Sequence, residues 1–161
     1  MDYLWTPWRY QYIAQAIAGK RPDCVFCDAA ARTDDDVTLV VERGQHSFLI
    51  LNRYPYTSGH LMVVPFAHVA ELSLCDAATL AEMMNFSQRV EGAFKKLYRP
   101  DGMNFGMNLG GAAGAGVAGH LHLHGLPRWF GDTNFMTTTA ETRVHPEEVA
   151  TTYERLKKAL A

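Results

Sequence analysis

The sequence predicts an α+β fold in which one long helix and one C-terminal helix pack against a largely antiparallel sheet of about five strands. Short apolar runs bounded by turn residues outnumber the helical segments. They do not alternate regularly with helices, as they would in a parallel sheet. The 161 residues are 48% hydrophobic and contain no linker or internal repeat, so we expect a single domain over residues 1–161.

The first two strands are expected to form a hairpin. A polar turn at residues 33–36 precedes a β-branched run, and Arg43-Gly44-Gln45 separates this run from the next. A loop rich in Asn, Pro, Ser and Gly follows at residues 52–59, and a glycine-rich stretch precedes the last strand. The five expected strands are residues 37–42, 46–51, 60–66, 103–109 and 120–126.

The two expected helices have clear boundary signals. Asp76 is placed to cap a helix that runs to about Tyr98, and Pro146 opens the last one. The last helix has glutamates in its first turn and lysines in its last, which suits the helix dipole. The apolar positions of the long helix, which we expect to face the core, are Leu80, Met83, Met84, Val90, Phe94 and Leu97.

The charge composition of the chain argues against two classes of binding partner. The net charge is -2 and the pI is about 6.4, without a Lys/Arg block, so neither a nucleic-acid duplex nor a membrane surface is expected as a partner. No apolar run reaches the roughly 18 residues of a membrane span. The three cysteines are an odd number and no secretion signal is visible. We therefore expect a cytoplasmic protein with reduced thiols.

The strongest chemical signal is the row His120-Leu121-His122-Leu123-His124. Alternate side chains of a strand share a face, so all three imidazoles should point one way, roughly 6–7 Å apart, with both leucines opposite. Such a row could bind a catalytic metal ion. Alternatively, one histidine could be a nucleophile and the others could bind phosphate. In the second case, an Nδ1–H donated to a backbone carbonyl would leave Nε2 free at neutral pH.

The glycine-rich stretch before the row is compatible with phosphate. Its glycines allow the backbone to approach a ligand, and successive N–H groups can form an anion nest. A flexible hairpin loop is an equally good interpretation. The stretch is not a dinucleotide fingerprint, because a strand rather than a helix follows. The glycines are Gly110, Gly111, Gly114, Gly116 and Gly119.

The row and its flanking residues, His120 to Arg128, resemble the signature of the histidine-triad (HIT) family. Gly125 is the unusual position, because family members commonly have a bulky residue there. Other segments agree in the same order, so that the resemblance covers about residues 22–130. They are Cys24-Val-Phe-Cys27, Leu51-Asn52-Arg-Tyr-Pro55, Gly59-His60-Leu-Met-Val-Val-Pro65, His68 and Asn104-Phe-Gly-Met-Asn108.

A narrower resemblance points to the bacterial diadenosine tetraphosphate phosphorylase branch of the family. It rests on residues 4–9, residues 51–65 and residues 127–135. The domain then divides into an N-terminal arm (1–21), a core (22–130) and a C-terminal extension with a helix (131–161). The family also implies a HIT-like fold and a homodimer with a joined sheet.

The family resemblance implies a two-step reaction on a small-molecule nucleotide. His122 would attack the α-phosphorus and form a nucleotidyl-histidine, which inorganic phosphate or water would release. His124 would contact the phosphates, Asn52 the ribose, and Asn108 the phosphates and the leaving group. The family often has Gln followed by Ser or Thr before the triad; here Ala115 and Gly116 stand there, and Gly116 is the expected substrate contact.

A metal site is expected beside the nucleophile. Cys24-x-x-Cys27 could be a redox pair, but the βαβ context of thioredoxin-like proteins is absent. The resemblance to zinc-bearing members of the family adds His68 and His120 as ligands. Four protein ligands leave no open position, so one structural zinc ion per chain is expected.

Three other functions remain open at this stage. One is a nucleoside phosphoramidate or adenylate hydrolase of the same fold. Another is a zinc-stabilised nucleotide-binding module without turnover, and a third is a hydrolase with a three-histidine catalytic metal. Trp129 and Asp132 are possible substrate contacts, and His60 is a residue that could order the Asn52 loop.

Overall fold

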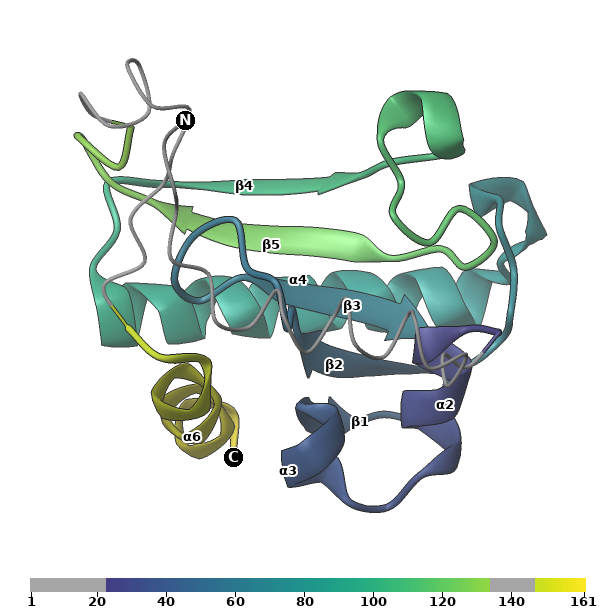
Figure 1. Cartoon of the computed structure of the whole chain (residues 1–161), viewed down its shortest axis with the longest axis horizontal. Coiled ribbons are helices and arrows are strands. Elements are labelled where there is room, and N and C mark those ends of the chain that lie inside the picture. The colour runs from purple at the N-terminus through teal and green to yellow at the C-terminus, as the bar shows by residue number, and fades with distance from the viewer. Residues whose placement is uncertain (1–22, 134–146) are drawn as a thin grey trace, which may run out of the picture.

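The computed structural model describes residues 23–133 and 147–161. Its centre is a five-stranded sheet in the order β1-β2-β3-β5-β4, with every neighbouring pair antiparallel (Figure 1). The predicted α+β fold and sheet are confirmed. The N-terminal arm (1–21) and Pro146, the predicted start of the last helix, lie outside the described residues. The last helix begins only at Val149, so Glu147 and Glu148 precede its first turn rather than lie in it, as was expected. The strands are β1 Val40–Arg43, β2 Ser47–Leu51, β3 Leu61–Pro65, β4 Gly102–Met107 and β5 Leu123–Arg128.

Both predicted helices are present. α4 (Ala77–Tyr98) begins as expected, because the Asp76 carboxylate accepts the backbone N–H of Thr79 at 2.7 Å. α6 (Val149–Leu160) ends the chain. In the described parts of the chain, no helix has the length and apolar character required to cross a bilayer. Short additional elements are α2 (Val25–Ala31), α3 (Asp35–Thr38) and the 3-10 turns η1 (Leu72–Leu74) and η2 (Gly111–Ala113).

Three expected boundaries or positions were wrong. Val37 belongs to α3 rather than to the first strand, because Leu39 at the end of that turn takes a left-handed φ of 67° and β1 begins only after it. β5 begins at Leu123, so the first two histidines of the row precede the paired strand. Met84 is 58% exposed, whereas Met83 beside it is buried in the core.

The sheet is covered on both faces. Along β2 and β3, alternate residues enter two separate clusters, as the two-residue period of a strand requires. Figure 1 shows α4 running along one face and α6 lying near the end of the sheet that β1 forms. Residues of both helices join Leu49, Val63 and Leu123 in the larger cluster. The smaller cluster, on the opposite face, contains Phe26 and Ala29 of α2.

Glu82 of α4 closes the β1–β2 hairpin. Its carboxylate accepts the backbone N–H groups of Gln45, His46 and Ser47 at 2.8, 2.8 and 2.6 Å, and the Ser47 hydroxyl at 2.7 Å. A Cβ on Gly44 would lie 2.7 Å from this carboxylate, so the close approach requires glycine. Burial raises the pKa of the Glu82 carboxyl, but the four donors outweigh it and the net pKa is lowered.

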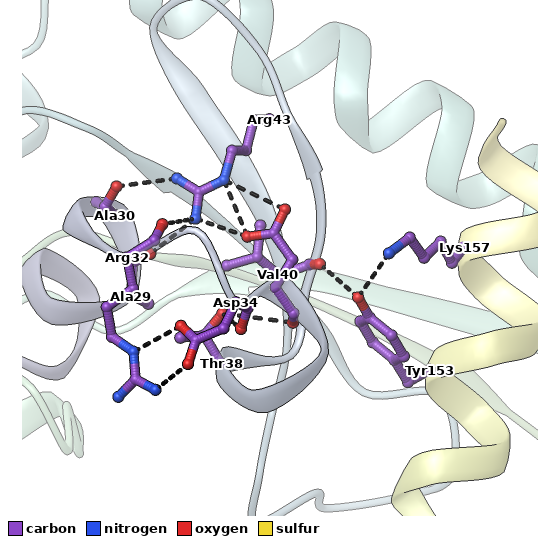
Figure 2. Close-up of polar contacts among 10 residues, drawn as sticks. Ala29, Ala30, Arg32, Asp34, Thr38, Val40, Arg43, Tyr153 and Lys157 are labelled. Atoms are coloured by element: carbon purple, nitrogen blue, oxygen red, sulfur yellow. Dashed lines mark hydrogen bonds and ion pairs between the residues drawn. The ribbon is translucent and has the colours of Figure 1, made fainter.

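Arg43 fixes α2 to the sheet (Figure 2). Its guanidinium donates to the carbonyl oxygens of Ala29, Ala30 and Arg32 at 2.9, 2.9 and 2.7 Å, and it pairs with Asp35 at 2.7 Å. These carbonyls lie in and just after the last turn of α2, where helical partners are lacking. One side chain therefore holds the segment that follows Cys24, Phe26 and Cys27.

Candidate active site

The histidine row lies on the α2 face of the sheet, as its alternation predicted. His124 pairs in register with Met62 of the α2-side cluster, whereas Leu123 joins the α4-side core. The rings of His122 and His124 are 4.9 Å apart and nearly perpendicular. This is closer than the strand spacing suggested, because His122 precedes the regular strand.

His122 is held in a defined tautomer. Its Nδ1 lies 2.8 Å from the carbonyl oxygen of His120, which can only accept, so Nδ1 bears the proton. Burial lowers the pKa of the His122 imidazole, against the opposing effect of that carbonyl, so the ring is neutral at pH 7. A neutral imidazole protonated on Nδ1 has an unprotonated, nucleophilic Nε2.

His124 lies at the other end of the row and contacts His60, the residue just before β3. Its Nδ1 is 2.8 Å from Nε2 of His60, which is fully buried. Burial, and then the nearby His122, lower the pKa of His124 to about 4. Gly59 makes the turn that places His60: its φ is +82°, and a Cβ there would lie 3.0 Å from Pro127.

The four predicted metal ligands are brought together. One donor atom from each of Cys24, Cys27, His68 and His120 lies within 4.8 Å of all the others. Cys24 Sγ is 3.3 Å from His120 Nδ1, and Cys27 Sγ is 3.2 Å from His68 Nδ1. Tetrahedral zinc, with its usual bond lengths, separates sulfur and nitrogen ligands by about 3.5 Å. The donor chemistry and the spacing therefore both fit zinc.

The protonation of His120 also fits a metal ligand. Its Nε2 lies 2.9 Å from the carbonyl oxygen of Pro65 and must donate to it, which leaves Nδ1 unprotonated and facing the thiols. A hydrogen bond of this kind on the far nitrogen is what orients histidine ligands in metal sites. Burial raises the pKa of the Cys27 thiol and lowers that of His120, so a bound cation is needed to hold the thiolate form.

Phe26 lies between the candidate metal cluster and His122. It stands between the two cysteines in the sequence, and its ring is 5.3 Å from that of His120 and 5.0 Å from that of His122. The side chain is buried, so it forms a wall of the site. Phe26 was not among the predicted site residues, although its place inside the Cys-x-x-Cys turn is a signal in the sequence.

The three other expected substrate contacts, Asn52, Asn108 and Gly116, differ in their hydrogen bonds and their exposure. The Asn52 amide oxygen accepts the N–H of Tyr54 at 2.9 Å, and its Nδ2 is 3.3 Å from His60 Nδ1. His60 also accepts the Tyr56 N–H at 3.1 Å, so it orders the Asn52 loop as expected. Asn108 directly follows β4 and lies beside the glycine-rich loop. Its Nδ2 is 4.0 Å from the position that a Cβ atom on Gly114 would occupy. Gly116 is exposed.

The glycine-rich loop is only partly available for anion binding. The N–H groups of Ala113, Gly114 and Ala115 donate to the loop carbonyls of Gly110 and Gly111, at 3.0 to 3.4 Å. The expected nest therefore cannot use these three amides, because a donor already paired inside the loop is not free for a ligand. 

Trp129 and Asp132 both form hydrogen bonds with other residues of the protein. The indole N–H of Trp129 donates to the carbonyl of Tyr98 at 3.2 Å, and Asp132 accepts two bonds from Arg128 at 2.5 and 2.9 Å. These contacts position the end of β5. Their use by a substrate stays a prediction.

Comparison with known proteins identifies the family of the chain. The HIT domain family model matches residues 34–131, which is more than half of the sequence. The chain belongs to the HIT domain family. Within it, the chain is 42% identical over 152 residues to the AP-4-A phosphorylase of Mycobacterium tuberculosis, covering 91% of this chain and 78% of that protein. The predicted resemblance to the family and to its diadenosine tetraphosphate phosphorylase branch is confirmed.

Solved structures of HIT proteins share the fold. A zinc-bound histidine triad family protein from Mycobacterium smegmatis superposes with a TM-score of 0.68 at 30% identity, covering 86% of this chain and 93% of that one. A histidine triad nucleotide-binding protein from Sulfolobus tokodaii gives a TM-score of 0.62 at 29% identity, covering 85% and 89%. The chain thus has the family's sheet and helices over most of its length.

Proposed function

We propose that this HIT protein is a nucleotidyl transferase or hydrolase that cleaves dinucleoside polyphosphates, with diadenosine tetraphosphate as the favoured substrate. The observation that most supports this proposal is the neutral imidazole of His122, whose Nδ1–H is bound to the His120 carbonyl at 2.8 Å. The unprotonated Nε2 of such a ring is a nucleophile toward a nearby phosphorus atom. The name of the 42%-identical mycobacterial relative supports the same substrate class.

The proposed reaction has two displacements at one phosphorus atom. Nε2 of His122 attacks the α-phosphorus, and the bond to the departing nucleoside polyphosphate breaks as the nucleotidyl-histidine forms. Inorganic phosphate or water then attacks the same phosphorus, and His122 departs with its electron pair. His124 and the backbone N–H of Gly116 would stabilise charge on the nonbridging oxygens, while Asn52 and Asn108 would hold the ribose and the leaving group.

A zinc ion is part of the proposal as a structural element. Cys24, Cys27, His68 and His120 would hold one ion per chain with no open coordination position. The ion would neutralise two thiolates and fix the ring of His120. The zinc-bound relative from Mycobacterium smegmatis supports this assignment.

We include a homodimer in this proposal. β4 lies at the edge of the sheet and is largely exposed, and Phe105 and Leu109 present apolar surface there. An open edge strand of this kind is suited to pair with a second copy and join the two sheets. Light scattering of the purified protein should give twice the mass of the chain, and Phe105→Lys should reduce it. A monomer at high concentration would contradict this part.

Labelled inorganic phosphate tests the reaction. With diadenosine tetraphosphate and phosphate, phosphorolysis puts the label into ADP, whereas hydrolysis yields unlabelled AMP and ATP. His122→Asn is the control and should give neither product. Turnover of nucleoside phosphoramidates or adenylates in preference to the diadenosine compound would favour the hydrolase alternative.

Two further alternatives are tested by the same samples. Nucleotide binding without turnover of any phosphoanhydride or phosphoramidate by the parent protein would favour a non-catalytic zinc-stabilised module. Activity that survives zinc removal and chelation would argue against a three-histidine catalytic metal. The Nδ1 of His120 lies 3.3 and 3.6 Å from the sulfur atoms of Cys24 and Cys27, which supports a place for this ring among the proposed zinc ligands rather than in a three-histidine site.

A further inference from the structure

Two parts of the candidate site depend on where α2 lies. Cys24 directly precedes this helix and Cys27 lies in its first turn, and both belong to the candidate metal cluster. Phe26, between them, has its ring 5.0 Å from that of His122. Any shift of α2 would therefore change the cluster and the wall beside His122 together.

The helix is too short to keep this position by its own hydrogen bonds. α2 has 7 residues, well short of the roughly 12–15 at which an isolated helix becomes even marginally stable in water. The residue at its start, Cys24, makes no side-chain capping hydrogen bond, and two of its residues, Phe26 and Ala29, are buried. The position of α2 must therefore depend on contacts from other elements.

Arg43 of β1 supplies such contacts at the end of α2 (Figure 2). The carbonyl oxygens that accept its guanidinium N–H groups are those of Ala29, Ala30 and Arg32. The Asp35 carboxylate orients the guanidinium, because its Oδ1 accepts from Nε and Nη2 at 3.0 and 2.7 Å. A guanidinium presents its N–H groups in a rigid plane, so several acceptors at once fix the direction of the helix as well as its place. The anchored carbonyls begin only two residues after Cys27.

We propose that Arg43 is a positioning residue of the candidate site: by fixing α2, it holds the two cysteines at the spacing that a metal ion requires and keeps Phe26 against His122. The inference rests on the proposed function for the identity of the ion and for the role of His122. Arg43 is not a member of the metal cluster and acts on it through the helix. Lysine is a poor substitute, because a single ammonium group lacks the planar fork.

Arg89 of α4 provides a matched control, because it makes the same kinds of contact with a different helix. It pairs with Glu42 at 2.6 Å and donates to the carbonyl oxygen of Leu160, at the end of α6, at 2.5 Å. Loss of this guanidinium should lower the stability of the protein without moving α2. The comparison of Arg43 with Arg89 thus separates positioning of the site from general destabilisation.

The zinc affinity of the full-length protein, measured by competition with a chromophoric chelator, tests the effect on the cluster. In Arg43→Gln we expect the dissociation constant for zinc to rise by about 10- to 100-fold, the effect typical of groups that orient metal ligands. Arg43→Lys should lie between this variant and the parent, and Arg89→Gln should bind zinc as the parent does. An unchanged affinity in Arg43→Gln, or an equal loss in Arg89→Gln, overturns the proposal.

Proton NMR of the metal-free protein tests the effect on Phe26 without zinc or substrate. In the parent we expect nuclear Overhauser effects between the rings of Phe26 and His122, as their 5.0 Å separation implies. Arg43→Gln should lose them and Arg89→Gln should retain them. If they are already absent in the metal-free parent, or persist in Arg43→Gln, Arg43 does not set the place of α2 and the proposal falls.

Failure of the proposed function has a different signature. If the parent binds no zinc, the zinc assignment fails and the Overhauser comparison alone decides on Arg43. If the parent binds zinc but does not turn over nucleotides, the proposed reaction fails while the affinity comparison still decides. If Arg43→Gln does not fold, Arg43→Lys and Asp35→Asn replace it, since the second keeps the guanidinium but removes the carboxylate charge that orients it. Zinc affinity equal to that of the parent in both variants overturns the proposal, and a loss in both supports it.

Discussion

The carbonyl oxygen of His120 accepts the Nδ1–H of His122 at 2.8 Å, while the ring of the same His120 faces Cys24 and Cys27. One residue thus takes part in two candidate sites: its side chain lies in the candidate metal cluster, and its backbone fixes the proton of His122, the proposed nucleophile. The candidate metal cluster is therefore connected to the ring of His122 through the atoms of a single residue.

Replacement of the nucleophile should abolish the chemistry and preserve the fold. For His122→Asn we expect kcat to fall by several powers of ten, because no other described side chain of the row has both the free nitrogen and the position. Acid-quenched parent enzyme should contain a nucleotide bonded to histidine, detectable by mass spectrometry. An unchanged rate in the variant would contradict the assignment of His122 as the nucleophile.

Removal of the two cysteines should remove the metal. In Cys24→Ser/Cys27→Ser we expect zinc content, measured by elemental analysis, to fall from one ion per chain to nearly none. A loss of about 3 kcal/mol in stability would lower Tm by about 6–12 °C in a domain of this size. Cys75→Ser is the matched control and should retain zinc. Full zinc occupancy in the double variant would refute the ligand assignment.

His124 predicts a loss of stability in acid. Its pKa in the folded protein is about 4, below the ordinary value of 6.5, so the unfolded chain binds the proton more tightly. The contribution of His124 to the free energy of unfolding is fully present above pH 6.5. It is lost as the pH falls from 6.5 to 4, with a total loss of about 3 kcal/mol, and does not change further below pH 4.

Denaturant titrations of the parent and of His124→Gln over this pH range measure that contribution as a difference. The parent should lose more stability than the variant between pH 6.5 and 4. Parallel curves would show that burial against His60 and His122 does not perturb His124.

Glu82 should contribute far more to the free energy of unfolding than Glu91, which lies on the same helix. Glu82→Ala removes the acceptor of three backbone N–H groups and one hydroxyl, and we expect a loss of about 2–3 kcal/mol in the free energy of unfolding. Glu91→Ala breaks only an exposed pair with Lys95 and should cost about 0.5 kcal/mol or less. Chemical denaturation measures both, and similar losses would contradict the hairpin's dependence on Glu82.

The sequence predicted most of the sheet and both long helices because their signals are local. β-branched runs, the Asp76 cap and the helical spacing of Met83, Val90 and Phe94 depend only on near neighbours. α2 and α3 were missed because they are 7 and 4 residues long, too short for a periodic pattern. Val37 consequently looked like the start of a strand.

The same distinction holds in the candidate site. The row of histidines and the Cys-x-x-Cys turn are local patterns, and the structure brings His68 and His120 to the cysteines as expected. His60 was given only a loop-ordering role, because its contact with His124 depends on the register between β3 and β5. Pairing of strands that are distant in the chain cannot be read from either strand alone.

Phe26 stands between the two cysteines and lies against the nucleophile's ring. Any attempt to reshape that side of the pocket for another substrate must therefore alter the same four-residue turn that supplies two thiols. If the cluster holds its proposed zinc ion, changes of selectivity here are tied to retention of that ion, so variants at position 26 should be screened for metal content before they are screened for new activity.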